Sequence, residues 1–145
     1  EYEYLKNLGA IEIINRSELE ESSKKPMLSA KWSGVIDNVG GKTLSNLIKS
    51  VGMHGCVCVL GNVSGDYFET SVYPFLLRGI SLIGIDSASK DKNLRDDLWI
   101  KLSKEWKIDN LVDLCRLVPL KNLDEEINLI LKGGQKGRVV VKLWD

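Results

Sequence analysis

Two apolar segments, each followed by small or polar residues, constrain the fold of this chain more than any other feature. The segment from Val72 to Ser87 reads VYPFLLRGISLIGIDS, and the segment from Trp32 to Gly41 reads WSGVIDNVGG. Each pattern is typical of an apolar strand with small or polar side chains at its carboxyl end. Open α/β sheets bind their ligands at that end of the strands. We therefore expect an α/β protein with a ligand site at one edge of its sheet.

Apolar periodicity predicts that strands and helices alternate along the rest of the chain. Leu44, Leu47, Ile48 and Val51 have helical spacing. The continuous apolar run 56–60 is typical of a strand buried on both faces, as in parallel sheets. The resulting order indicates a mainly parallel sheet. The pattern predicts strands at 10–14, 34–39, 56–60, 80–85, 114–118 and 139–143, and helices at 1–8, 41–51, 73–77, 94–106 and 123–131, with a further helix start possible near Ser17. The strand at 34–39 is expected to be buried, and Gly79 is expected to end the helix at 73–77. Leu94, Leu98, Leu102 and Trp106 are expected on one dry face of the helix at 94–106.

Composition argues against several classes of function. The 145 residues include 20 Lys and Arg and 20 Asp and Glu, and this balance argues against a basic nucleic-acid-binding surface. No run approaches the roughly 18 apolar residues that a membrane span requires. No signal peptide is recognisable at the start, and the three cysteines are an odd number, so we expect a reduced, cytoplasmic protein. Cys56 and Cys58 are too close together for a Cys-x-x-Cys site, and with His54 as the single histidine a zinc site is not expected.

Two glycine or polar clusters remain open to two interpretations each. The chain has no G-x-G-x-x-G, and the loop from Gly61 to Gly65 does not lead straight into a predicted helix. Gly40-Gly41 could form a tight strand-to-helix turn, or could allow a ligand to approach the bare backbone. Asp86 and Ser87 could face a ligand, or could cap the helix that follows.

Several blocks, in order and at plausible spacing, together resemble one family over nearly the whole chain. The sequence resembles the zinc-independent medium-chain dehydrogenase/reductases, in the branch of NADPH-dependent acryloyl-CoA reductases and quinone-oxidoreductase-like proteins. The blocks that carry the likeness are EYLKNLGA at 3–10, WSGVIDNVGGK at 32–42, VYPFLLRG at 72–79, GIDS at 84–87, LKG at 131–133 and GRVVVK at 137–142.

The resemblance implies a Rossmann-like, doubly wound fold that is truncated at its N-terminus. Residues 1–111 would form the C-terminal part of an NADP-binding Rossmann domain. Residues 112–145 would form a segment that packs toward an absent GroES-like catalytic domain. The family's first strand-helix-strand unit and its glycine-rich pyrophosphate turn are missing, so the strand at 10–14 loses its neighbour, and this fragment alone is expected to be inactive. The intact protein would pass a hydride from NADPH to a 2-enoyl thioester such as acryloyl-CoA, or to a quinone, without a metal.

The resemblance also assigns cofactor contacts, all by position in the family's pattern. Arg16 would cover the adenine or its ribose phosphate, and Asn62 would meet the nicotinamide side through its backbone. Leu76 would pack beside the nicotinamide ribose, and Ser87 would lie at the end of the pocket. None of these residues is a general acid, so we expect no catalytic residue in this chain.

The resemblance also implies a cofactor contact near the C-terminus and a dimer contact at the sheet edge. Gly133 would lie in a turn that closes over the cofactor, and Arg138 is a weaker candidate there. The strand Ile80–Ile85 would lie at the edge of the sheet and pair with its copy in a homodimer. A different class of function also stays open: a dimerising remnant that binds no cofactor.

Overall fold

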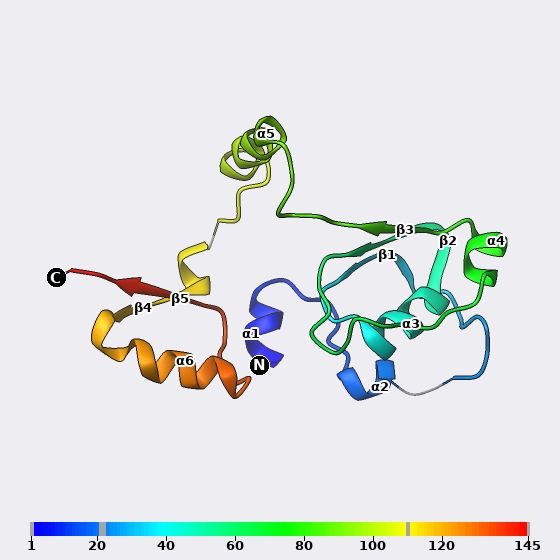
Figure 1. The fold of residues 1–145 in the computed structure, drawn as a ribbon, viewed down its shortest axis with the longest axis horizontal. Helices are drawn as coiled ribbons and strands as arrows, with labels where there is room; N and C mark the ends of the chain where they lie inside the picture. Colours follow the sequence, from blue (N-terminus) through cyan, green and yellow to red (C-terminus); the bar gives the residue numbers. More distant parts are fainter. Residues whose placement is uncertain (1, 21–22, 110, 145) are drawn as a thin grey trace. The chain divides into compact units, whose positions relative to one another are not determined.

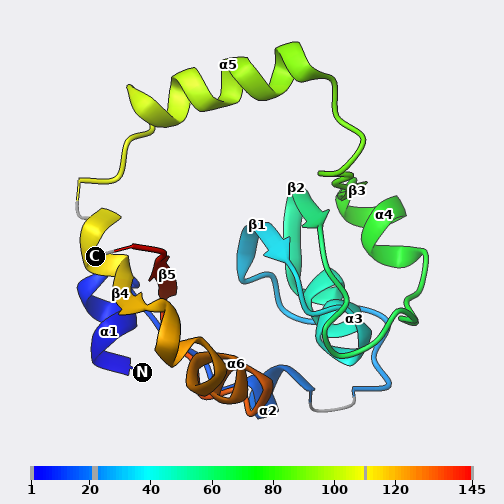
Figure 2. The same ribbon diagram turned by 60° about the vertical axis from the view of Figure 1, so that its left-hand side comes forward.

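The computed structural model describes residues 2–20, 23–109 and 111–144. The chain divides into two compact units, residues 2–90 and residues 91–145, and we describe each by itself (Figures 1 and 2). The division expected from the resemblance, between residues 111 and 112, stays a prediction.

A parallel three-stranded sheet organises the unit 2–90. Its strands are β1 (Trp32–Asp37), β2 (Val51–Val59) and β3 (Ser81–Gly84), in the order β1-β2-β3. Both pairs are parallel, as the alternating pattern predicted. The connections contain α3 (Gly41–Ser50) and α4 (Tyr73–Arg78). In the described part of the chain, β3 lies at an edge of this sheet.

The core of this unit lies on one face of the sheet. Leu44 and Ile48 of α3 pack there with Val51, Val57 and Ile80, all nearly inaccessible to water. The predicted helical spacing of α3 is therefore confirmed as its buried face. The expectation that the strand at 34–39 is buried is wrong for this chain, because Ile36 is 81% exposed. The described residues cover the sheet on the α3 side, and side chains that alternate toward the other face stay accessible.

The N-terminal residues form two short helices with no strand between them. Helix α1 (Tyr2–Asn7) ends at Gly9, whose φ of +98° allows two closing hydrogen bonds, Gly9 N to Lys6 O at 2.9 Å and Ala10 N to Leu5 O at 3.0 Å. Helix α2 (Arg16–Glu20) follows. The predicted strand at 10–14 is wrong here: the segment pairs with no described strand, and Ile11 is 94% exposed. An extended segment without a partner lacks the ladder bonds that define a strand.

The unit 91–145 contains a second, two-stranded parallel sheet. It consists of β4 (Cys115–Pro119) and β5 (Arg138–Lys142), joined through α6 (Leu123–Leu131). The short 3-10 turns η1 (Leu111–Leu114) and η2 (Leu120–Asn122) flank β4. The side chains of Arg116 and Glu126 form a two-pronged ion pair, with N–O distances of 2.6 and 2.5 Å, which connects β4 to α6. Hydrogen bonds from this arginine lower the pKa of the Glu126 carboxyl.

Helix α5 (Lys92–Ser103) confirms the predicted helix but not its buried stripe. Asp91 caps its N-terminus, with the Asp91 carboxylate accepting from Asn93 N at 3.1 Å. Leu94, Leu98 and Leu102 were expected on one dry face, yet all three are exposed. Periodicity predicts which side chains share a helix face, but the burial of that face depends on what packs against it.

Candidate functional site

The carboxyl ends of the three parallel strands form the candidate site. Beyond the strands the ladders continue, because Leu60 N donates to Asp37 O and Ile85 N donates to Val59 O, both at 2.8 Å. The segments that follow the three strands, 38–41, 60–65 and 85–87, therefore begin side by side. This is the edge at which open α/β sheets bind ligands, as the sequence predicted.

Asp37 fixes the first of these segments. Its side chain is 2% exposed, and its carboxylate accepts from Gly40 N at 3.0 Å and from Val39 N at 3.3 Å. These bonds hold the chain in the turn that leads from β1 into α3. The sequence analysis did not single out Asp37. An aspartate that closes an apolar strand, three residues before a glycine, is a signal of such a turn.

The structure favours one of the two interpretations of Gly40-Gly41. Both glycines have positive φ, +71° and +56°. A Cβ at Gly40 would lie 2.5 Å from Gly65 O, and one at Gly41 would lie 3.2 Å from Ser64 O. The missing side chains therefore make room for the loop 61–65. This geometry supports the interpretation of Gly40-Gly41 as a tight strand-to-helix turn.

The loop 61–65 lies backbone to backbone against the turn after β1. A Cβ at Gly61 would lie 2.7 Å from Asn38 O, and Ser64 N donates to Val39 O at 2.8 Å. Gly65 N closes the loop on Asn62 O at 3.0 Å. The side chain of Asn62 stays exposed at this edge. Close backbone packing thus positions the loop, and it explains the glycines at positions 40, 41 and 61.

A polar turn follows β3. The Asp86 carboxylate accepts from Ala88 N at 3.0 Å and from Ser89 N at 3.1 Å, and Ser87 lies exposed inside this turn. The hydrogen bonds from Ser89, and then that from Ala88, lower the pKa of the Asp86 carboxyl. The interpretation of Asp86 as the cap of the following helix is wrong, since Asp91 caps α5.

The carboxyl edge also contains two places where the backbone is uncovered. A Cβ built on Gly65 or on Gly84 would meet no other atom within 4 Å. Bare backbone beside open space is what a flat ring or a ribose needs for close approach. The edge near Asn62 and Ser87 can therefore accept one end of an extended ligand.

The residues assigned by resemblance do not all meet at this edge. Asn62 and Ser87 do, on neighbouring strand ends. Arg16 is exposed at the start of α2, a helix held against α3 by a hydrogen bond from Asn46 Nδ2 to Leu19 O at 2.7 Å. Leu76 is 73% exposed on α4, whose last turn lies at the amino end of β2.

Two further assigned residues, Gly133 and Arg138, belong to the other unit. Gly133 follows α6 with a φ of +69° and has open space around it, and Arg138 begins β5 and is exposed. Their roles, like those of Arg16 and Leu76, stay predictions.

Side chains that could bind a metal ion do not cluster in the part of the chain that the structure describes. Those residues contain no group of three His, Cys, Asp or Glu side chains that could hold a metal ion. Cys56 and Cys58 lie on one face of β2 with their sulfur atoms 3.8 Å apart, and burial, followed by the neighbouring thiol, raises the pKa of Cys56. Nor does any described helix have the length and apolar character of a membrane span.

Comparison with known proteins gives consistent results over almost the whole sequence. The profile of the family described as zinc-binding dehydrogenase matches residues 1–102. The protein named quinone oxidoreductase YhfP of Bacillus subtilis is 38% identical over 97% of this chain and 43% of its own length. Acrylyl-CoA reductase AcuI of Ruegeria pomeroyi is 36% identical over 96% of this chain and 42% of its own length.

Solved structures agree with these sequence matches. Bacillus subtilis yhfP with NAD bound matches with a TM-score of 0.91, at 38% identity, over 98% of this chain and 44% of that protein. Escherichia coli YhdH with bound NADPH matches with a TM-score of 0.87, at 31% identity, over 97% of this chain and 43% of that protein. The predicted Rossmann-like α/β fold class is confirmed. The chain spans less than half the length of the relatives it matches.

Proposed function

Because the chain belongs to the zinc-binding dehydrogenase family, we propose that it is part of an NADPH-dependent oxidoreductase. The observation that carries this proposal is the pair of close structural matches that hold NAD or NADPH. Both cover nearly all of this chain at 31–38% identity, well above the level at which only the fold is shared. The intact enzyme would use residues outside this sequence for the rest of the cofactor.

The carboxyl edge of the sheet fits one end of this dinucleotide. The open backbone at Gly65 and Gly84 leaves room beside Asn62 and Ser87. We assign the nicotinamide side to this edge, with Asn62 acting through its backbone and Ser87 bounding the pocket. The bound cofactor supplies the hydride, and the protein supplies position and electrostatics. The rigid packing of the loop 61–65 against the turn after β1 holds this edge in place. None of the assigned residues is a general acid, and we assign no catalytic residue.

The proposed substrate is a 2-enoyl thioester such as acryloyl-CoA, whose C=C bond is reduced. The similarity to an acrylyl-CoA reductase supports this choice, and the similarity to a protein named quinone oxidoreductase supports a quinone as the alternative acceptor. No metal takes part in the proposed reaction. We also propose that residues 1–111 complete a Rossmann domain, that residues 112–145 pack toward a GroES-like domain, and that the protein works in the cytoplasm.

Replacing Arg16 with alanine is expected to weaken NADPH binding more than NADH binding. If Arg16 meets the 2′-phosphate, one charge-assisted contact is lost, which costs about 1.5–3 kcal/mol, or roughly 10- to 150-fold in affinity. The measurement is a calorimetric titration of both cofactors into the longer protein that contains this chain. Arg95→Ala, which removes an exposed arginine of α5, is the matched control. Equal weakening of both cofactors would instead place Arg16 over the adenine ring.

We further propose that the protein is a homodimer joined through the Ile80–Ile85 strand. The residues of β3 are all exposed, and the strand lies at an edge of the described sheet. Ile85 N points toward β2, where it donates to Val59 O. Since backbone groups alternate along a strand, Leu82 N points to the open edge. Pairing with a second copy across a twofold axis would satisfy it.

A Leu82→Pro variant is expected to stay folded and to become monomeric. Proline removes the outward donor at Leu82 and spares the ladder to β2. Light scattering of parent and variant measures the change. Ile83→Pro is the contrasting control, because Ile83 N has the same orientation as Ile85 N and its loss should unfold the sheet. A parent that is monomeric at micromolar concentration, or a Leu82→Pro variant that stays dimeric, contradicts this interface.

A further inference from the structure

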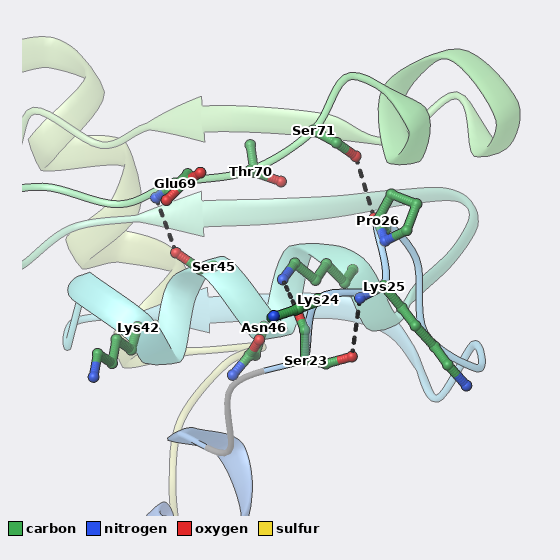
Figure 3. A pocket seen from close by; sticks show the side chains of 11 residues that line it. Ser23, Lys24, Lys25, Pro26, Lys42, Ser45, Asn46, Glu69, Thr70 and Ser71 are labelled. Atoms are coloured by element: carbon green, nitrogen blue, oxygen red, sulfur yellow. Dashed lines mark hydrogen bonds between the residues drawn. The ribbon is translucent and has the colours of Figure 1, made fainter.

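A lysine-rich pocket lies along α3, within the unit 2–90 (Figure 3). It has a volume of about 530 Å³ and is formed by one side of α3, the segment 23–26 and the segment 69–71. This volume falls inside the range of ~300–1,000 Å³ that is typical of small-molecule sites. The lining residues are Ser23, Lys24, Lys25, Pro26, Lys42, Ser45, Asn46, Lys49, Glu69, Thr70 and Ser71.

The charges of this lining are strongly unbalanced. Four lysines line the pocket, against one carboxylate, that of Glu69. Lys49 donates to Ser23 O at 3.0 Å, which leaves two of its three N–H groups available. Lys24, Lys25 and Lys42 are exposed and form no ion pair with any described carboxylate. Four like charges around one hollow repel one another, and a bound anion would relieve that repulsion.

The pocket is elongated rather than centred on one point. Lys42 and Lys49 are two helical turns apart and so share a face of α3. Figure 3 shows Lys42 at one end of the pocket and Lys25 at the other. A linear chain of phosphates matches such an extended lining better than a single phosphate does.

The hydroxyl groups of the lining differ in their availability. Ser45 accepts from Glu69 N at 3.0 Å and donates to Gly41 O at 3.2 Å, and Ser71 donates to Pro26 O at 3.2 Å. These bonds shape the wall of the pocket. Thr70 Oγ1 is buried and has no hydrogen-bond partner among the described residues. A buried hydroxyl without a hydrogen-bond acceptor is uncommon in folded proteins. A ligand oxygen in the pocket could serve as the acceptor for Thr70.

We propose that this pocket binds a polyphosphate chain, as inorganic polyphosphate or as the phosphate tail of a nucleotide. Lysine ammonium groups form charge-assisted hydrogen bonds with phosphate oxygens. A cleft lined by one sign of charge also concentrates oppositely charged ligands. None of the lining residues belongs to the carboxyl-edge segments 38–41, 60–65 and 85–87, and this inference does not depend on the proposed reductase activity.

The test is a calorimetric titration of the full chain with inorganic tripolyphosphate at low salt. We expect saturable binding that the double variant Lys24→Gln with Lys42→Gln weakens by at least about tenfold. The control double variant, Lys107→Gln with Lys121→Gln, removes the same charge from exposed positions outside the pocket and should bind like the parent. Absence of saturable binding, or equal weakening by both double variants, overturns the proposal.

Two further arms complete the test and need no variant. Binding to the parent chain should weaken as salt rises, since salt screens exposed charges, and salt-independent binding would contradict a site made of lysines. ATP has the same triphosphate chain as tripolyphosphate. Tighter binding of ATP would support a nucleotide as the source of the phosphates, and tighter binding of tripolyphosphate would support inorganic polyphosphate.

Discussion

A Gly40→Ala variant is expected to lose about 2–5 kcal/mol of its free energy of unfolding. Gly40 has φ +71° and ψ −158°, a backbone conformation that residues other than glycine rarely adopt. The added Cβ would also lie 2.5 Å from Gly65 O, a backbone atom that moves only if the loop 61–65 moves. Urea unfolding of parent and variant, followed by circular dichroism, measures the loss.

Gly84→Ala is the matched control for this variant. A Cβ at Gly84 meets nothing within 4 Å and φ is not positive there. The free energy of unfolding should change by no more than about 1 kcal/mol, in the stabilising direction, because alanine loses less backbone entropy in a strand. A Gly40→Ala variant as stable as Gly84→Ala would show that the two loops at the carboxyl edge are not packed as described.

An Arg78→Met variant is expected to lose roughly 2–4 kcal/mol of its free energy of unfolding. The Arg78 guanidinium donates to three carbonyl oxygens: Leu28 O at 2.6 Å, Val51 O at 2.8 Å and Lys49 O at 3.0 Å. It therefore holds the segment before β1 against the end of α3 and the start of β2. Methionine keeps much of the apolar stem but offers no donor to these carbonyls.

Arg95→Met is the control for the loss of a guanidinium. Arg95 is exposed on α5, so its replacement should stay within about 0.5 kcal/mol of the parent. Urea unfolding again gives both values. If the two arginine variants were equally stable, the three hydrogen bonds of Arg78 would not contribute to the fold.

Local patterns in the sequence were sufficient to predict most elements of this fold. Helix α6 begins and ends where its apolar spacing indicated, and the left-handed Gly79 ends α4 as expected. Such features depend on neighbours a few residues away. The strand at 10–14 was predicted wrongly for the opposite reason, because a strand exists only if another segment pairs with it.

The candidate site was predictable in outline but not in its contacts. The carboxyl edge with Asn62 and Ser87 followed from the strand pattern. The contact that explains Gly40 comes from Gly65, and the clamp of Arg78 reaches Leu28, 50 positions away. Contacts between distant segments have no signature in one sequence. The pocket along α3 was missed for the same reason, since its lysines come from separate segments.

NADPH oxidation by the intact protein is the measurement that tests whether this chain is part of an NADPH-dependent reductase. With acryloyl-CoA as acceptor, we predict one NADPH consumed for each propionyl-CoA formed, with NADPH used in preference to NADH. Oxidation with a quinone alone would support the alternative acceptor. If neither acceptor causes NADPH oxidation and calorimetry detects no NADPH binding, the claim is contradicted, and the dimerising remnant without a cofactor becomes the better account.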